Sequence, residues 1–422
     1  MDIEYKYLRP KKAALLKSRY EIYRDYGESR ITAVSDGAVV PPYIDSHGDL
    51  IAGVVDDSGR FVVDSHCVDF PEEIEQHASS LIFNKEDKII VYLGYFNQHW
   101  GHFITDCLST FWFLGKIDAD KYVFSCETGS PEIHPNIRLA LNLLGVWDKI
   151  EIVSRPVRYR KVYVPRRGMI PRDYILKESS VVYDKIIDAA SEELPDMDYP
   201  EKLILGRSQL AKAIENDYGT IEIEQFFKDN GFVAIFPEKI TLVQLIGYLA
   251  NAREVMVISG TLAHNMLFAP CGSRLIVIEK YPNINNYQQG IDRLKNLKVT
   301  YIDASYFIWP VSPGLGPFIM SDTLCLQSYA KDFNFTAPSP FNRDRKVLRK
   351  FFRKYYKHYK RRLISPEWLE SEIGLFNEAY QESFDVFGKW LSGVRPIFLS
   401  DALRPRYIVK NLLRYIGKLR KS

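Results

Sequence analysis

Short apolar runs alternate with helical patterns along this chain, and this alternation limits the fold more strongly than any other feature of the sequence. Between residues 203 and 302, runs rich in Ile, Leu and Val are separated by segments with apolar residues at helical spacing. Buried strands joined by crossover helices form a parallel sheet with helices on both faces. We therefore predict a doubly wound α/β domain with strands at residues 203–205, 232–236, 255–258, 275–278 and 299–302.

The same rhythm, less regular, occupies residues 88–193, where we predict strands at residues 89–93, 122–124, 150–153 and 162–164. A polar, proline-containing stretch at residues 194–200 is the expected linker. Residues 1–80 show only short strand patterns, such as residues 61–63. The expected architecture is two doubly wound α/β domains that face a cleft, followed by a basic helical extension. Their predicted ranges are 1–195, 200–310 and 311–422.

Two histidines and a carboxylate lie at the start of an amphipathic helix expected at residues 101–114. His102 and Asp106 are four residues apart and are therefore neighbours on one helical face. A carboxylate beside an imidazole fixes its tautomer and raises its basicity, as a general base requires. We predict His102, oriented by Asp106, as the base, with His99 or Asp106 itself as alternatives. The pair could instead only hold the helix against the preceding loop.

A turn in the second half of the chain has the chemistry of an anion site. Ser259, Gly260 and Thr261 connect an expected strand to a short helix, so backbone N–H groups and a helix dipole face the carboxyl end of the strand. Gly260 allows a phosphate to approach the backbone closely. His264 and Asn265 add polar groups to an otherwise apolar helix, either for a ligand or as a core histidine and a local cap.

Cations are expected at the same edge of the second domain. Arg207 follows the strand at residues 203–205, and Lys212 lies shortly beyond it. Two cations converging on the Gly260 turn would suit a diphosphate leaving group. Glu279 ends another strand, where a carboxylate could accept hydrogen bonds from ribose hydroxyls or simply cap the sheet edge.

The charge of the chain is unevenly distributed. Residues 343–422 carry 20 Lys and Arg against 8 Asp and Glu, whereas the preceding residues carry 36 against 45. Basic residues alternate with aromatic ones in residues 343–362, and residues 407–419 repeat this composition. Such segments favour an anionic membrane surface, and no nucleic acid is expected because no groove-reading motif accompanies them. A helix packed against the acidic body of the protein is the alternative.

The five cysteines are widely spaced and form no CxxC pair, which argues against a disulfide framework or structural zinc. The sequence shows no signal-peptide pattern and no apolar stretch long enough to span a bilayer. We therefore expect a cytoplasmic protein, with at most peripheral binding to the inner face of the cell membrane.

The polar motifs form three blocks in a characteristic order. The blocks are His99 to Phe103 with Asp106; Arg207 to Lys212 with Ile214, Asn216 and Asp217; and Ser259 to Asn265 with Phe268 and Glu279. Together they resemble glycosyltransferase family 61, in its bacterial branch associated with capsule and surface polysaccharide assembly. The resemblance covers residues 88–303.

This resemblance implies a GT-B type fold and inverting sugar transfer from a nucleoside-diphosphate sugar, with no cofactor and no essential metal. It assigns Arg207, Lys212 and Asn216 to donor binding. Lys212 and Asp217 replace the family's usual Arg and Glu, and Lys212 keeps the charge without the bidentate fork of arginine. His264 stands where the family usually has Thr, so the nucleotide or sugar could differ.

These observations predict a glycosyltransferase that binds a glycan or lipid-linked glycan acceptor over the face formed by residues 99–106 and a nucleotide-sugar in the second domain. A polysaccharide pyruvyl transferase or a nucleotide-sugar epimerase on a similar scaffold is the alternative. A non-catalytic, membrane-associated glycan-binding scaffold is less favoured, because polar groups cluster at the strand ends.

Overall fold

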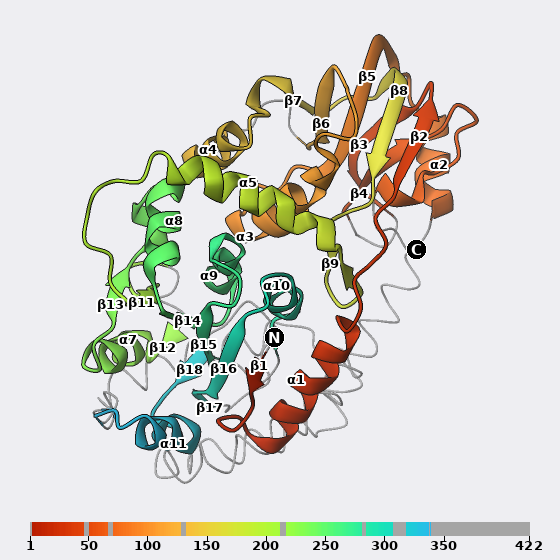
Figure 1. The fold of residues 1–422 in the computed structure, drawn as a ribbon. Coiled ribbons are helices and arrows are strands. Elements are labelled where there is room, and N and C mark those ends of the chain that lie inside the picture. The colour runs from red at the N-terminus through yellow and green to blue at the C-terminus, as the bar shows by residue number, and fades with distance from the viewer. Residues whose placement is uncertain are drawn as a thin grey trace, which may run out of the picture.

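The computed structural model describes residues 2–45, 50–65, 71–127, 132–211, 217–280, 284–306, 318–336 and 338. This part of the chain is a mixed α/β structure with several sheets (Figure 1). The predicted donor-binding residues Lys212 and Asn216 lie outside the described residues. The same holds for the basic segments at residues 343–362 and 407–419.

A six-stranded parallel sheet, here called the second sheet, contains the five strands predicted between residues 203 and 302. Its strands are β1 (Asp2–Glu4), β11 (Lys202–Leu205), β13 (Val233–Ile235), β14 (Glu254–Ile258), β15 (Arg274–Glu279) and β16 (Lys298–Asp303). Their order is β1-β16-β15-β14-β11-β13, with every pair parallel. The central strands are continuous apolar runs because helices cover them on both sides.

Apolar side chains from the two faces of the second sheet enter different clusters. On one face, residues such as Leu203 and Val257 pack with α8 (Leu242–Asn251), α10 (Gln288–Leu294) and α1 (Pro10–Ile22). On the other face, residues such as Ile204 and Met256 pack with α7 (Thr220–Lys228) and α11 (Leu324–Asp332). Thr241 and Gln244 form a capping box at the start of α8.

The strand order creates a topological switch point in the second sheet. Strand β11 pairs with β13 on one side and with β14 on the other, so the path of the chain through the sheet reverses between β11 and β14. Ligands of doubly wound sheets bind outside the carboxyl ends of the strands at such a point. Arg207 lies two residues after β11, and Ser259 and Gly260 directly follow β14.

The sequence pattern predicted a wholly parallel first sheet, but this sheet is mixed. Its strands are β2 (Ile31–Ser35), β3 (Ala38–Ile44), β4 (Leu50–Val55), β5 (Asn84–Tyr95), β6 (Lys121–Ser125), β7 (Ile150–Val153) and β8 (Val157–Pro165). The predicted strands correspond to β5–β8, which pair in parallel. Strands β2 and β3 run antiparallel to β8, and β4 runs antiparallel to β3.

The strand predicted at residues 61–63 is wrong. Phe61 forms only an isolated bridge to Val55, and a 3₁₀ turn covers Val63–Ser65. The other edge of β4 is open because β4 is the last strand of the sheet, but the chain enters the 3₁₀ turn two residues after Phe61, so the pairing does not extend. The remaining helices beside the first sheet are α2 (Pro71–Ser79) and α4 (Pro135–Leu143).

The segment predicted as one amphipathic helix is helical throughout, but three types of helix follow one another in it. It comprises α3 (Trp100–His102), a π-helical turn (Phe103–Cys107) and a 3₁₀ helix (Leu108–Phe113). Every residue of the 3₁₀ helix is buried, so the expected polar face is confined to the first two turns. Leu108 N–H donates to Phe103 O, five residues earlier, and Tyr183 Oη donates to Ile104 O at 2.6 Å. Such π-turns are common at functional sites.

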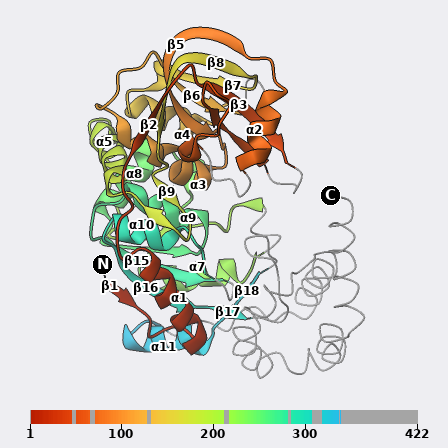
Figure 2. The same ribbon diagram turned by 90° about the vertical axis from the view of Figure 1, so that its right-hand side faces the viewer.

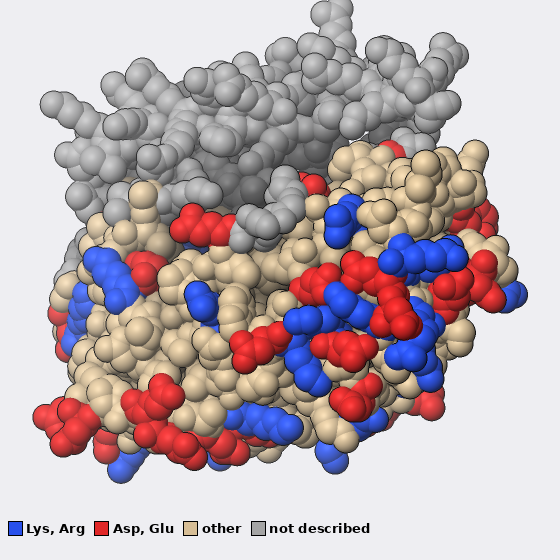
Figure 3. Space-filling view, turned by 90° about the horizontal axis from the view of Figure 1, so that it is seen from above, with Lys and Arg blue, Asp and Glu red and all other residues tan. Residues whose placement is uncertain are grey.

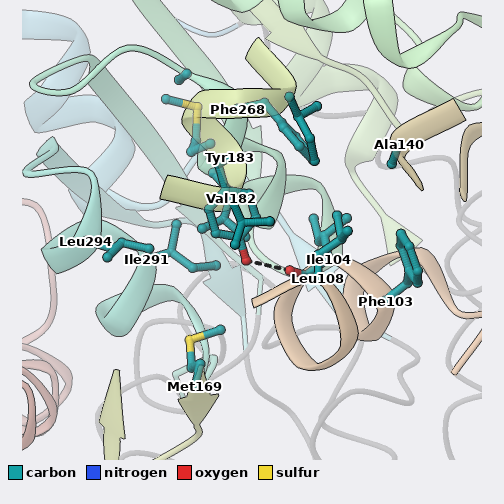
Figure 4. Packing of buried hydrophobic residues seen from close by; sticks show 14 of the residues in the cluster. Phe103, Ile104, Leu108, Ala140, Met169, Val182, Tyr183, Phe268, Ile291 and Leu294 are labelled. Carbon is teal, nitrogen blue, oxygen red and sulfur yellow. Dashed lines mark hydrogen bonds between the residues drawn. The ribbon is translucent and has the colours of Figure 1, made fainter. Parts of the chain in front are cut away.

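One hydrophobic cluster joins the two sheets. Tyr183 of α5 (Ser180–Ser191) lies among Ile104 and Leu108 of the helical stretch and Phe268, which follows α9 (Thr261–His264) (Figure 4). The rings of Tyr183 and Phe268 meet edge to face, with centroids 5.8 Å apart. The two halves of the protein are therefore packed against each other through an apolar interface beneath the polar residues described below.

The N-terminal residues lie with the second sheet. Strand β1 pairs with β16, and α1 lies beside this edge (Figure 2). The sequence-based domain ranges remain predictions. Shorter strands are β9 (Met169–Ile170), β10 (Tyr174–Ile175), β12 (Asp217–Tyr218), β17 (Ser305–Tyr306) and β18 (Phe318–Met320). Among the described residues, no helix combines the length and apolar composition needed to cross a bilayer.

Candidate functional site

The predicted His102–Asp106 pair is present. His102 Nδ1 lies 3.0 Å from Asp106 Oδ2, and Asp106 Oδ1 accepts a hydrogen bond from Thr105 Oγ1 at 2.9 Å. Arg167 Nη2, from the segment after β8, lies 3.6 Å from the same Oδ2. A carboxylate held in this way favours the tautomer with its proton on Nδ1, which leaves Nε2 as the basic nitrogen.

His102 is both basic and accessible. The hydrogen bond that His102 donates to Asp106 raises the pKa of His102 above its ordinary value, although burial and the charge of Arg167 oppose this shift. The His102 side chain remains 41% exposed, so a substrate hydroxyl can reach it. Tyr287 Oη, from the second half of the chain, lies 3.3 Å from His102 Nδ1. Burial raises the pKa of Tyr287, so this phenol stays neutral.

The helix that carries His102 directly contacts the Gly260 turn region. A Cβ atom on Gly101 would lie 2.7 Å from Thr261 Cγ2 and 3.3 Å from His264 Nδ1, so glycine is required for this approach. Trp100 Nε1 donates to Asn265 Oδ1 at 2.8 Å across the same contact. Two elements distant in the sequence are thereby packed directly against each other.

His264 and Asn265 are more deeply buried than their neighbours in this contact. Asn265 also donates to the Leu262 carbonyl, and His264 packs against Tyr287 with ring centroids 5.5 Å apart. Burial lowers the pKa of His264 to about 4, with the Asn285 side chain opposing only part of the shift, so the ring is neutral at pH 7. Both side chains contact protein groups here, and their role toward a donor stays a prediction.

Arg207 lies beside the Gly260 turn. Its Nη1 is 3.9 Å from the position that a Cβ of Gly260 would occupy, and its Nη2 lies 2.7 Å from Asp217 Oδ2. Gly260 has a φ of 132°, which residues with a side chain rarely adopt. Glu224 accepts hydrogen bonds from the backbone N–H groups of Arg207 and Ser208 and so fixes the loop after β11.

The helix dipole at the Gly260 turn is weaker than the sequence pattern predicts. Helix α9 contains only four residues before it continues as a 3₁₀ turn, so few peptide dipoles align behind Gly260. Binding of an anion at this turn would therefore depend on the Arg207 guanidinium and on individual N–H groups. The side chain of Thr261, part of the predicted anion site, lies against Gly101.

Two buried ionisable residues follow one another at the carboxyl end of β15. Glu279 is 1% exposed, and burial raises its pKa to about 7. Lys280, which the sequence analysis did not identify, places Nζ 3.4 Å from Asp217 Oδ2 and 4.4 Å from the centroid of the Phe318 ring. Its backbone N–H donates to Ser259 Oγ at 3.4 Å, so Lys280 lies next to the Gly260 turn.

His99 precedes α3 and is exposed, with its ring centroid 5.4 Å from that of His102. It therefore remains an alternative base on position alone. Within the ranges that the structure describes, no three His, Cys, Asp or Glu side chains are grouped as metal ligands would be. The prediction that no metal is essential needs a direct test.

Residues 100–276 match the family model described as Glycosyltransferase 61. This region belongs to glycosyltransferase family 61. The resemblance to family 61 drawn from the three motif blocks is thus confirmed, whereas its bacterial capsule branch stays a prediction; glycosyl transfer is the activity class that the family implies. No curated protein matches the chain. The family 61 region contains His102, Asp106, Arg207 and Gly260, whereas Glu279, Lys280 and Tyr287 lie beyond its end.

Three residues of this site escaped the sequence analysis. Arg167, Lys280 and Tyr287 have no motif spacing that links them to His102 or Arg207, because each reaches the site through tertiary packing. Lys280 directly follows an apolar strand that was correctly predicted. A charged residue in that position at the carboxyl end of a parallel strand was the one available signal.

Proposed function

We propose that this chain transfers a sugar from a nucleoside-diphosphate sugar to a hydroxyl group of a glycan acceptor, with inversion at the anomeric carbon. The contact between α3 and α9 supports this proposal. The His102 imidazole meets the Tyr287 ring, which packs against His264 at the end of α9. The Arg207 guanidinium lies beside Gly260, at the start of α9. A base and a cation separated in this way could act on opposite ends of one reacting sugar.

In the proposed reaction, Nε2 of His102 accepts the proton of the acceptor hydroxyl while Asp106 stabilises the resulting imidazolium. The acceptor oxygen forms a bond to the anomeric carbon as the bond from that carbon to the diphosphate oxygen breaks. Arg207 stabilises the negative charge on the departing diphosphate, with Lys212 and Asn216 as further predicted donor-binding residues. Ser259, the Gly260 backbone and Glu279 would contact the nucleotide.

We further propose a GT-B type arrangement, in which the two sheets carry the acceptor and donor sites, and a role in capsule or surface polysaccharide synthesis at the cytoplasmic face of the membrane. Metal-independent transfer is part of the proposal, with Arg207 supplying the charge that a metal ion would otherwise contribute. Activity that persists in excess chelator after exhaustive metal removal would support this point, and loss restored by a divalent cation would refute it.

A panel of nucleotide-sugars tests the proposed function. The matching donor should raise the unfolding temperature of the full chain, because a ligand that binds only the folded state stabilises it. Release of nucleoside diphosphate from that donor should then require an added glycan acceptor. Conversion of the donor without acceptor would indicate an epimerase instead, and consumption of phosphoenolpyruvate would indicate a pyruvyl transferase.

The basic Asp106–His102 pair gives the reaction a defined pH dependence. A raised pKa means that His102 is protonated, and inactive as a base, up to a pH above its ordinary value of about 6.5. We expect kcat/KM to rise with pH through that raised pKa. In Asp106→Asn the midpoint should move to lower pH, because the hydrogen bond that raises the pKa of His102 is weakened. An unchanged midpoint would mean that protonation of His102 does not cause the fall of kcat/KM at low pH.

The membrane prediction for residues 343–422 is tested separately. On the face shown in Figure 3, Lys and Arg are interspersed with Asp and Glu among the described residues, so the basic tail is the expected source of binding. The full chain should sediment with liposomes containing anionic lipid at low salt and be released at high salt. Equal sedimentation of a chain truncated after Asp332 would contradict the prediction.

A further inference from the structure

Three adjacent parallel strands of the second sheet end in polar groups beside one another. Arg207 follows β11, Ser259 and Gly260 follow β14, and Lys280 follows β15, in the spatial order β11-β14-β15. The hydrogen bond from Lys280 N to Ser259 Oγ joins the last two ends. The Arg207 guanidinium approaches Gly260 from the other side. Lys280 and Arg207 therefore flank the turn.

Both cations are held by one oxygen of one carboxylate. Asp217 Oδ2 lies 2.7 Å from Arg207 Nη2 and 3.4 Å from Lys280 Nζ. The side chains of Arg207, Lys280 and Asp217 are 17%, 8% and 2% exposed. Lys280 is buried and Arg207 is largely shielded from solvent, so sharing one anion leaves a positive charge without a full counter-ion, which is unfavourable where water is scarce.

Other carboxyl groups nearby have partners of their own or are only partly ionised. Glu224 accepts hydrogen bonds from Arg207 N, Ser208 N and Ser208 Oγ. Glu279 directly precedes Lys280, but its raised pKa of about 7 leaves it partly protonated at neutral pH. Asp303, paired in register with Glu279, is bound by Arg9 Nη1 at 2.7 Å and Lys12 Nζ at 2.9 Å. Among the described residues, the ion pairs of Arg207 and Lys280 both go to Asp217, so an anionic ligand between the two cations would supply the second negative charge.

We propose that Lys280 is a second cation of the leaving-group site, and that Asp217 is a resident counter-ion which holds Arg207 and Lys280 until a diphosphate group binds between them. This inference rests on the proposed function, because it assumes a nucleoside-diphosphate donor. The Phe318 ring lies 4.4 Å from Nζ, and this cation–π contact persists while the ammonium group exchanges one anion for another.

The exchange predicts a change in proton binding. Burial, and then the Arg207 charge, lower the pKa of Lys280 to about 8, with Asp217 and Glu279 opposing the shift. A diphosphate beside Nζ favours the charged amine and so raises this pKa. Binding at a pH slightly above 8 should therefore take up a proton onto Nζ, and affinity should fall as the pH rises further.

Calorimetry on the full chain tests the proposal, with uridine, guanosine, cytidine, adenosine and thymidine diphosphates as probes. For the tightest probe, Lys280→Met should weaken binding by about 10- to 100-fold at neutral pH, as expected for loss of a charge-assisted hydrogen bond. Lys298→Met is the matched control, because Lys298 is exposed at the amino end of β16, on the opposite edge of the sheet, and should bind as wild type does.

Lys280→Arg provides a second test of the proposed role of Lys280 if Lys280→Met does not fold. Arginine stays charged, so this variant should bind the diphosphate but lose both the proton uptake near pH 8 and the fall in affinity above it. Wild-type affinity in Lys280→Met, or unchanged proton uptake in Lys280→Arg, would overturn the inference while leaving the proposed function intact. If the wild-type chain binds none of the five diphosphates, the proposed function and this inference both fail.

Discussion

Replacing His102 with alanine should lower turnover by roughly 10²- to 10⁴-fold, the range expected when a general base is removed. The structure makes His102 the strongest candidate, because Asp106 holds Nδ1 at 3.0 Å and the ring is still 41% exposed. The side chain lies on the accessible part of a helical stretch, so its loss should leave the fold intact. Turnover of the variant would be measured with the donor and acceptor found in the panel, beside a thermal melt.

His99→Ala is the matched control for this experiment. His99 lies in the same short segment and is exposed, but it precedes α3, whereas His102 lies on the helical stretch four residues before Asp106. Its replacement should change turnover by less than about 10-fold. Near-wild-type turnover in His102→Ala, or a larger loss in His99→Ala, would move the base to another residue.

Arg207→Met should lower kcat/KM by about 10²- to 10³-fold, as expected when a preorganised group that stabilises developing charge is removed. The guanidinium lies beside Gly260 at the switch point of the second sheet, where a leaving diphosphate is expected. Part of the loss should appear as weaker binding of the nucleoside diphosphate in calorimetry. Lys280 still pairs with Asp217 in this variant, so the carboxylate is not left buried without a partner.

Arg253→Met serves as the control, because Arg253 precedes β14 at the opposite edge of the same sheet and is 78% exposed. It should keep wild-type kinetics and affinity. Unchanged diphosphate affinity together with unchanged kcat/KM in Arg207→Met would place the donor away from the Gly260 turn.

The second sheet could be predicted from sequence because its strands are continuous apolar runs. Residues 275–278, for example, are buried on both faces, so β15 is recognisable without knowing its neighbours. The capping box at Thr241 is likewise a local signal that specifies the start of α8. Strand order then follows from the doubly wound pattern, which places Arg207 near Gly260.

The first sheet was less predictable because its antiparallel strands lack a simple local pattern. Strand β3 contains Pro41 and Pro42, and its pairing with β4 shifts register between Val40 and Tyr43. Proline cannot donate a backbone hydrogen bond and usually argues against a paired strand. Only the contact with β8 and β4 makes this segment a strand, and that contact cannot be read from the segment itself.

The candidate site likewise contains one part that local sequence predicts and one part that it does not. The His102–Asp106 pair follows from spacing along one segment, and the structure forms it although the segment is π-helical there. Tyr287 contacts His102 although the two residues are 185 positions apart in the chain. Arg167, in the segment after β8, contacts Asp106. These contacts depend on how the two sheets pack, which periodicity does not specify.

The central claim is that a base from one half of the protein and cations from the other act on one sugar from opposite sides. Proton NMR of the product, recorded early in turnover with an α-configured nucleotide-sugar donor, tests this claim most directly. The account predicts a β-linked product, because displacement from the side opposite the diphosphate inverts the anomeric carbon. An α-linked product formed by the same chain would contradict it.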